Sequence, residues 1–279
     1  MIETPEDLLA LPDRERKAFF ERIRAWPMLI DEHLRWLQNK VKYELTWLLD
    51  MGQDRRTGCF HASSLSYYRE CQRVAYYQYN AKVGDSPATK TQRIFHTGHA
   101  VHAQIQAYFK SMHERTIEAL DNGTELPPLP ISELEMEAGF WDEDLEMSGH
   151  CDLLGYFHDE VHGDVRFVGE IKSMKHNSFL KAQKAQKPFP YHLDQATAYC
   201  KEFWAPFAIF IYFDKDESDF LVFPVMFDEN RWEELVKVLE DARELESLTD
   251  VFRPASFKCK DCDFNRICKP GRYTRRGRR

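Results

Sequence analysis

The sequence lacks any apolar segment long enough to cross a membrane. Its longest apolar run, Phe203 to Phe213, covers eleven residues and includes a proline, whereas a membrane helix needs roughly 20 residues. The first residues, Met1 to Asp7, are acidic and lack the basic and then apolar layout of a signal peptide. We therefore expect a soluble, cytoplasmic protein with no membrane partner.

The cysteine content does not suit a disulfide framework. Seven cysteines are an odd number, and a reducing compartment disfavours disulfides, so metal ligation is the leading use for any clustered subset. Cys259, Cys262 and Cys268 lie within ten residues of one another. The sequence has no second C-x-x-C pair, which a structural zinc site usually contains. A fourth ligand must therefore come from a distant part of the chain.

The net charge of −8 argues against a nucleic-acid partner only if the charge is evenly spread. It is not: residues 171–193 contain five lysines and no acid, and residues 272–279 contain five arginines and no acid. If the first segment is helical, a stripe of lysines on it can neutralise phosphates or form a solvated helix face; these are Lys181, Lys184 and Lys187. The basic tail 271–279 can contact nucleic acid or be a disordered end.

A hydrophobic content of 43%, with 20 Phe and 6 Trp, predicts a folded protein with a large core. Apolar residues at helical spacing predict helices, and alternating or wholly apolar runs predict strands. Helices are expected over 1–55, 63–79, 93–120, 176–187, 191–203 and 228–248, and strands over 134–140, 147–157, 165–172, 207–213 and 220–227. This order predicts an α/β fold, with a mixed β-sheet flanked by helices.

Two acidic residues and a lysine stand out in the predicted strands. Residues two apart in a strand point to the same face, so Glu170 and Lys172 project together. If strands 147–157 and 165–172 form a hairpin, its midpoint falls near Val161, and the numbers of facing residues add up to about 322. Asp152 then lies opposite Glu170. The spacing therefore predicts two carboxylates and one ammonium on a single face.

Such a trio suits the hydrolysis of a phosphodiester bond. Carboxylate oxygens hold Mg²⁺ or Mn²⁺, and a bound metal lowers the pKa of its water. An ammonium group nearby orients or helps to deprotonate that water and neutralises the charge that develops on the phosphate. The E-x-K pattern is nevertheless common in strands, so the trio by itself does not identify a nuclease.

Two further motifs flank the trio. Gly98 and His102 precede it, and Gln195 and Tyr199 follow it; each pair is spaced i, i+4 and shares one face of a predicted helix. The series G-x-x-x-H, G-x-x-D, E-x-K and Q-x-x-x-Y, in this order, resembles the RecB-like branch of the PD-(D/E)XK nucleases. The resemblance covers roughly residues 60–270.

The resemblance implies a restriction-endonuclease-like core and a role for each motif residue. His102, Asp152 and Glu170 would bind the metal together with the backbone carbonyl of Ile171. Lys172 would be the catalytic lysine, and the DNA strand would be positioned by Gln195 and Tyr199. An imidazole ligand favours tolerance of Mn²⁺. The neighbouring histidines, His96, His99 and His150, are interpreted as surface or packing residues.

The cysteines resemble a second family feature. One cysteine far from a C-terminal group of three is the arrangement found in the CRISPR-associated RecB-like exonucleases and the AddB-type helicase–nucleases. This resemblance implies that Cys71, Cys259, Cys262 and Cys268 hold a [4Fe–4S] cluster, with zinc in the same site as the alternative. Cys71 is followed by Gln72, where the CRISPR-associated family often has proline. Cys59 is a rival for the fourth ligand.

We thus expect a helical extension over 1–58, a nuclease domain over 59–270 whose ends the cluster joins, and a basic tail over 271–279. The predicted function is that of a metal-dependent DNA exonuclease in recombination, repair, or phage or CRISPR DNA processing, with a helicase or CRISPR protein as a candidate partner. The alternative is a catalytically silent DNA-binding subunit of a larger complex. An iron–sulfur redox protein is disfavoured, because no flavin or nucleotide motif is found. Four tyrosines can stack on single-stranded bases or belong to the core: Tyr67, Tyr68, Tyr76 and Tyr77.

Overall fold

The computed structural model describes residues 35, 39–41, 56–83, 89–159, 163–248, 251, 259, 262, 264, 267 and 268. The chain divides into two compact units, Met1–Gly52 and Gln53–Arg279. In the first unit Arg35 and residues 39–41 are helical. The rest of the predicted helices over 1–55, and the basic tail over 271–279, lie outside the described residues. The domain boundaries expected after residues 58 and 270 stay predictions.

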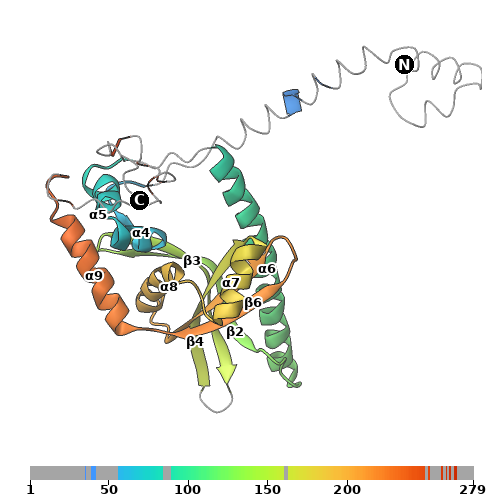
Figure 1. Ribbon diagram of the computed structural model, residues 1–279. Coiled ribbons are helices and arrows are strands. Elements are labelled where there is room, and N and C mark those ends of the chain that lie inside the picture. The colour runs from blue at the N-terminus through green and yellow to red at the C-terminus, as the bar shows by residue number, and fades with distance from the viewer. Residues whose placement is uncertain are drawn as a thin grey trace, which may run out of the picture. The chain divides into compact units, whose positions relative to one another are not determined.

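The second unit contains a mixed sheet with helices around it (Figure 1). Its six strands are β1 (Phe60–His61), β2 (Ile131–Asp142), β3 (Met147–Asp159), β4 (Gly163–Met174), β5 (Phe207–Asp214) and β6 (Phe220–Met226). Its α-helices are α4 (Leu65–Glu70), α5 (Gln72–Ala75), α6 (Thr89–Asn122), α7 (His176–Ala185), α8 (Pro190–Glu202) and α9 (Glu229–Arg243), with a 3₁₀ turn η1 (Ala62–Ser64) and a π-helical turn η2 (Tyr76–Asn80). The predicted α/β fold is confirmed.

The sheet has the strand order β1-β3-β4-β5-β6, and β2 pairs with β3. Strands β2, β3 and β4 form antiparallel pairs, β5 runs parallel to β4, and β6 returns antiparallel to β5. In the β3–β4 hairpin, Leu153 faces Gly169 and Asp159 faces Gly163. Every facing pair in this hairpin adds up to 322, so the register predicted from the turn position is confirmed.

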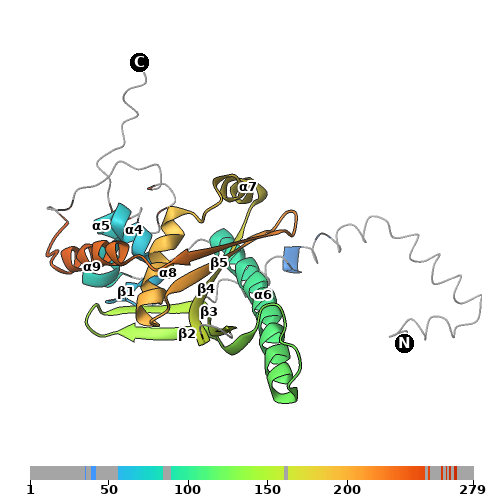
Figure 2. The same ribbon diagram turned by 90° about the horizontal axis from the view of Figure 1, so that it is seen from below.

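Side chains from alternate positions of the strands build two separate cores. Ile209 and Ile211 of β5 pack on one face with Ile105 of α6, whereas Phe210 packs on the other face with Leu235 of α9. Because both faces are covered, β5 is buried at five successive positions, as its continuous apolar run predicts. Figures 1 and 2 show α8 and α9 on one side of β4 and α6 on the other.

The helix boundaries agree with the sequence in some places and not in others. Helix α6 ends at Asn122 and is followed by Gly123 with a φ of +62°, the left-handed conformation that glycine adopts easily. The single helix predicted over 63–79 is wrong, because Cys71 is extended, with φ −153° and ψ 96°, and separates α4 from α5. Helix α9 ends at Arg243, five residues before the predicted end.

The burial pattern of β2 departs from the simple alternation that its sequence predicts. Ala138 is buried as expected, but Met136, predicted on the same buried face, is 40% exposed. The backbone of Glu137 has a φ of +54°, a left-handed conformation that interrupts a regular pleat. None of the described helices has both the length and the apolar character needed to span a membrane.

Candidate active site

The candidate site lies where two strands part. Strand β3 pairs with β1 at residues 147–148 and with β4 from residue 153 onward, so the described strands leave β3 unpaired on this side between these points. Asp152 lies in this gap, one residue beyond the last β3–β4 pair. Its Oδ2 accepts a hydrogen bond from the Ile171 N–H at 2.6 Å. The Asp152 carboxylate thus accepts the backbone hydrogen bond of Ile171 that a carbonyl of a paired strand would otherwise accept.

The E-x-K residues of β4 face helix α8. Lys172 forms an ion pair with Glu170, and its Nζ donates to Gln195 Oε1 at 3.1 Å. Gln195 Nε2 in turn donates to the Tyr199 hydroxyl at 2.8 Å. The structure therefore joins the E-x-K and Q-x-x-x-Y motifs through one chain of hydrogen bonds. Within it, Gln195 holds the ammonium of Lys172 in place.

His102 reaches the same place from helix α6. Its Nδ1 lies 3.1 Å from Asp152 Oδ1. Asp152 and Glu170 are 7% and 2% exposed, so the two carboxylates are held away from bulk water. The structure brings His102 next to Asp152 and links Glu170, Lys172, Gln195 and Tyr199 through an ion pair and hydrogen bonds. Among the described residues, however, Glu170 does not group with His102 and Asp152 at metal-ligand spacing. Their roles in binding and catalysis stay predictions.

One residue of the site was missed from the sequence. Glu137 of β2 offers a carboxylate oxygen that lies within 4.8 Å of ligand atoms of both His102 and Asp152. Buried Gln106 donates to Glu137 Oε1 at 2.7 Å and to the Asp152 carbonyl at 3.0 Å. It therefore holds the two acidic residues side by side. His102, Glu137 and Asp152 form a candidate binding site for a divalent metal.

The signal for Glu137 lies in the pairing of β2 with β3, not in β2 itself. Met136 faces Leu153 and Ala138 faces Cys151, which puts Glu137 opposite Asp152. The alternating pattern of β2 placed Glu137 among the solvent-facing glutamates and said nothing about its partner. The β2–β3 register was needed to see it.

The electrostatics of the site follow from burial and from close charges. Burial raises the pKa of the Glu170 carboxyl to about 7, although the charge of Lys172 opposes the shift. Burial lowers the pKa of Lys172, but the charges of Glu170 and Asp152 outweigh burial, and the net shift is upward. Lys172 is therefore an ammonium at neutral pH. For His102, burial likewise lowers the pKa, and the hydrogen bond and charge of Asp152 more than reverse it.

The donor set fits a hard divalent cation. Glu170 Oε2 is buried and has no hydrogen-bond partner among the described residues. An unpaired buried carboxylate oxygen is costly unless a cation or a donor satisfies it. Carboxylate oxygens suit Mg²⁺ and Mn²⁺, and an imidazole nitrogen is acceptable to Mn²⁺. His102, Glu137 and Asp152 have the spacing to hold such an ion, and Glu170 is the further carboxylate that the motifs predict.

The glycines of two motifs have different environments. A methyl group at Gly149, the glycine of G-x-x-D, would lie 2.6 Å from Phe140 and 2.9 Å from both Ala62 and Tyr199. A larger residue there would have to displace at least one of these side chains. At Gly98 the nearest atom is the Ser173 hydroxyl at 3.7 Å, an ordinary contact. The first motif therefore has no steric need for glycine.

The four cysteines expected to bind a cluster line one small cavity of about 20 Å³; they are Cys71, Cys259, Cys262 and Cys268. Phe264 borders it and stacks on Tyr77, with ring centroids 5.2 Å apart. Among the described residues, no three of these thiols lie within 4.8 Å of one another. The cavity joins the N-terminal and C-terminal parts of the predicted nuclease domain, but the thiols are not gathered at ligand distance.

Arg73 anchors the C-terminal part of the chain beside this cavity. Its guanidinium donates to the carbonyl oxygens of Leu248 and Val251 at 3.3 and 3.2 Å and lies 4.0 Å from Cys268 Sγ. Burial raises the pKa of the Cys71 thiol. Cys59 is buried, with its sulfur 3.8 Å from His61 Nε2, and is not among the described residues that line the cavity.

The structure agrees only in part with the lysine stripe and the stacking tyrosines that the sequence predicts for DNA binding. Lys181 and Lys184 are exposed on α7, whereas Lys187 lies beyond its end, after the left-handed Gln186. The three lysines therefore do not form one helical stripe. Tyr68 and Tyr77 are 0% and 7% exposed and belong to the core, whereas Tyr67 is 56% exposed. His96, His99 and His150 are exposed, as expected.

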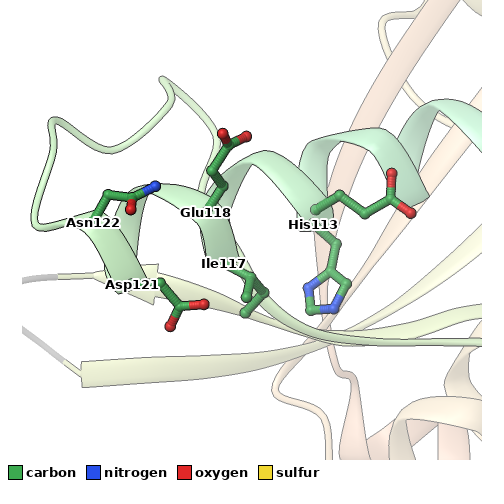
Figure 3. A pocket seen from close by; sticks show the side chains of 6 residues that line it. His113, Ile117, Glu118, Asp121 and Asn122 are labelled. Carbon is green, nitrogen blue, oxygen red and sulfur yellow. The ribbon is translucent and has the colours of Figure 1, made fainter.

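A pocket of about 460 Å³ lies along the last turns of α6 (Figure 3). Its lining residues are His113, Glu114, Ile117, Glu118, Asp121 and Asn122. No residue of the predicted site belongs to it. Three carboxylates in the lining make it unsuitable for a phosphate group.

The fold and the site together define an α/β protein with a candidate divalent-metal site at a split between two strands. No family model and no curated protein matches the chain. Among solved structures, the crystal structure of SSO0001 is similar at 17% identity and a TM-score of 0.49, over 86% of this chain and 96% of that chain.

Crystal structures of LHK-Exo are also similar. For LHK-Exo in complex with dAMP, the identity is 16% and the TM-score 0.47. For LHK-Exo described as an alkaline exonuclease from Laribacter hongkongensis, they are 14% and 0.44. Both matches cover 67% of this chain and 87% of that chain. Because the identities and TM-scores are low, the function proposed below rests on the residues of the site.

Proposed function

We propose that this protein is a metal-dependent deoxyribonuclease. The observation that supports it best is the pair His102–Asp152 at the β3–β4 split, bonded to the backbone of β4 beside the Glu170–Lys172 ion pair, with Gln195 bonded to the lysine. Metal-assisted phosphodiester hydrolysis uses a bound divalent ion and a nearby positive charge, and the candidate ligands and Lys172 offer both. The order of the four motifs supports a RecB-like PD-(D/E)XK nuclease.

Some residues of the site would bind the metal, and others would stabilise negative charge on the phosphate. His102, Asp152 and Glu170 would hold Mg²⁺ or Mn²⁺ with the carbonyl of Ile171, and the ion when bound would activate water and polarise the phosphate. Lys172, protonated at neutral pH, stabilises the negative charge that develops on the phosphate oxygens. Gln195 keeps the ammonium directed at that position. Asp152 also receives the Ile171 N–H, which fixes the orientation of its carboxylate.

We further propose exonucleolytic action on DNA ends or single strands, in recombination, repair, or phage or CRISPR DNA processing. The motif order, shared with RecB-like exonucleases, supports this mode of action. The exposed lysines of α7, which follow the catalytic strand in a segment without acid, support sequence-independent binding to the DNA backbone. A helicase or CRISPR protein is the candidate partner. The rival function is DNA binding without cleavage.

An assay of end-labelled single- and double-stranded DNA with Mg²⁺, Mn²⁺ or EDTA tests the proposal. Asp152→Ala is expected to abolish cleavage. Lys172→Ala is expected to lower kcat by about 10²–10³ and to leave Mn²⁺ binding, measured by calorimetry, unchanged. Lys201→Ala is the matched control, since Lys201 pairs with Glu229 at 3.2 Å outside the site. Cleavage by Lys172→Ala at the wild-type rate rejects the proposal, and binding without cleavage by the wild type supports the rival.

The cysteines are proposed to form a second, structural metal site. The arrangement of Cys71 with Cys259, Cys262 and Cys268 around one cavity supports a [4Fe–4S] cluster, with zinc as the alternative, because four thiols form the donor set for either. Ligation would tie the break between α4 and α5 to the C-terminal part of the chain. Its contribution is to folding, since the catalytic residues lie elsewhere.

Metal analysis of anaerobically purified protein tests this second site. The wild type is expected to be brown and to contain about four irons per chain. Cys268→Ala is expected to lose colour and thermal stability together. Cys59→Ala is the control, because that thiol contacts His61 instead of the cavity. Stoichiometric zinc without iron would favour the alternative metal, and bleaching by Cys59→Ala alone would show that Cys71 is not the fourth ligand.

A further inference from the structure

Helix α8 extends the candidate active site toward solvent. Tyr191, Gln195 and Tyr199 are spaced i, i+4, i+8 and therefore share one face of α8. Gln195 bonds to Lys172, and Tyr199 is 1% exposed. Tyr191 stands one turn earlier, about 6 Å along the axis from Gln195, and is 46% exposed. An open aromatic ring thus lies next to the residue that positions the catalytic lysine.

The ring of Tyr191 is held rigidly on one side. It stacks on Phe189 with centroids 5.4 Å apart and planes 8° from parallel. Phe189 stacks in turn on the fully buried Tyr212 at 5.9 Å, and its N–H donates to the Tyr212 hydroxyl at 2.9 Å. The edge of His192 packs against Tyr191 at 4.4 Å. The orientation of the exposed ring is therefore set by the core, so little conformational entropy is lost when a flat ligand stacks on it.

The surroundings favour a nucleotide as that ligand. Tyr191 lies in the segment 171–193, which contains five lysines and no acid. Burial raises the pKa of Tyr191, and the charge of Lys172 opposes that shift. A phosphate at Lys172 would place the attached base or its neighbour within reach of Tyr191. A single exposed aromatic residue is common on protein surfaces. Tyr191 differs because it is stacked on the core and lies one helical turn from the residue that holds Lys172.

We propose that Tyr191 is a stacking platform for a nucleobase adjacent to the scissile phosphate of single-stranded DNA. This inference rests on the proposed nuclease function and specifies its substrate. In a duplex both faces of an internal base are covered by its neighbours, so only a single strand or a frayed end offers a free face. The platform therefore predicts that single strands are the preferred substrate.

Steady-state kinetics on a single-stranded oligonucleotide test the platform. Tyr191→Ala is expected to raise KM about tenfold, as the loss of one base stack would, with kcat changed less than twofold because stacking is uniform binding. Tyr191→Phe retains the ring and is expected to stay within twofold of the wild type. Tyr108→Ala is the matched control, since Tyr108 is 47% exposed on α6 and lies outside this stack.

Abasic substrates separate stacking from a merely structural role. Removing the bases next to the cleaved bond is expected to raise KM of the wild type about tenfold and to leave KM of Tyr191→Ala unchanged, because the interaction is already lost. Fluorescence anisotropy with a labelled oligonucleotide in EDTA is expected to give the same pattern of Kd values without cleavage. If the two changes multiply, or if Tyr191→Ala affects abasic and intact DNA alike, the platform is rejected.

The same measurements distinguish the two levels of the proposal. Wild-type protein that neither binds nor cleaves single-stranded DNA rejects the nuclease function itself. Cleavage by the wild type, with equal KM for Tyr191→Ala and Tyr191→Phe, rejects only the platform. A loss of melting temperature in Tyr191→Ala together with a fall in kcat on every substrate indicates a packing role and also rejects it.

Discussion

The substitution Gly149→Ala tests how the motifs are built into the fold. The added methyl group would lie 2.6 Å from Phe140 Cε1, 2.9 Å from Ala62 Cβ and 2.9 Å from Tyr199 Cε1. These neighbours cannot move easily: Ala62 and Tyr199 are 0% and 1% exposed, and the Phe140 ring packs edge-on against Tyr199. The substitution therefore forces a backbone or ring displacement inside the core.

The expected loss of stability follows from two opposing effects. Overpacking a core by one methyl group costs about 1–3 kcal/mol, and three contacts below 3 Å place Gly149→Ala at the upper end of that range. The reduced entropy of the unfolded chain offsets about 0.4–1 kcal/mol. A net loss of about 2 kcal/mol remains, which lowers Tm by about 4–8 °C for a unit of this size. Differential scanning calorimetry measures the shift.

Gly98→Ala is the matched control, because it changes another motif glycine where the only close atom is the Ser173 hydroxyl at 3.7 Å. Inside helix α6, alanine stabilises by about 0.5–1 kcal/mol over glycine, so Tm is expected to rise slightly. Gly149→Ala should also reduce cleavage well below its melting temperature, since Tyr199 carries the hydrogen bond from Gln195. A Tm for Gly149→Ala equal to the wild type would refute the packing argument.

Two further predictions concern ion pairs outside the site. Asp194 is buried and accepts hydrogen bonds from Arg69 at 3.1 Å and from Arg231 at 2.6 Å. Asp194→Asn is therefore expected to lower the free energy of unfolding, measured by urea denaturation, by about 2 kcal/mol, the range for hydrogen bonds to charged groups. An unchanged free energy of unfolding would show that solvent screens these ion pairs fully. The hydrogen bond that His176 Nδ1 donates to the Asp214 carboxylate raises the pKa of His176. This contribution to stability is full below the unfolded pKa of about 6.5 and is lost as pH rises through the folded pKa. His176→Gln should therefore destabilise the protein more at pH 5.5 than at pH 8.5, and an equal effect at both would contradict the ion pair.

Local rules explain why much of the site could be predicted. The β3–β4 register depends on the position of a short turn, and one turn sets the partner of every residue in a hairpin. This is why the sequence alone is enough to set the facing pairs from Leu153–Gly169 to Asp159–Gly163, one residue short of Asp152 and Glu170. The helical repeat likewise places Gln195 and Tyr199 on one face of α8. These relations involve residues close in sequence or joined by one turn, so the sequence contains the information.

Other parts of the site depend on contacts between distant segments. Glu137 was missed because its partner is set by the β2–β3 register and by its own left-handed backbone, with φ at +54°. The break at Cys71 was missed because helical periodicity continues through it. In the folded chain, Arg69 of α4 bonds to Asp194 of α8. Such contacts override the weak local preference of a short segment for one continuous helix.

The sequence by itself determined the longer helices and strands and the hairpin register, and it supplied the motif residues of the proposed site, because periodicity and turn position are local properties of a chain. Only the tertiary structure decided which of these side chains meet. In the folded protein, His102 of α6 contacts Asp152, the ring of Tyr199 packs close to Gly149, and Tyr191 stays exposed one helical turn from Gln195. These positions result from how sheet and helices pack, and packing is a property of the whole fold.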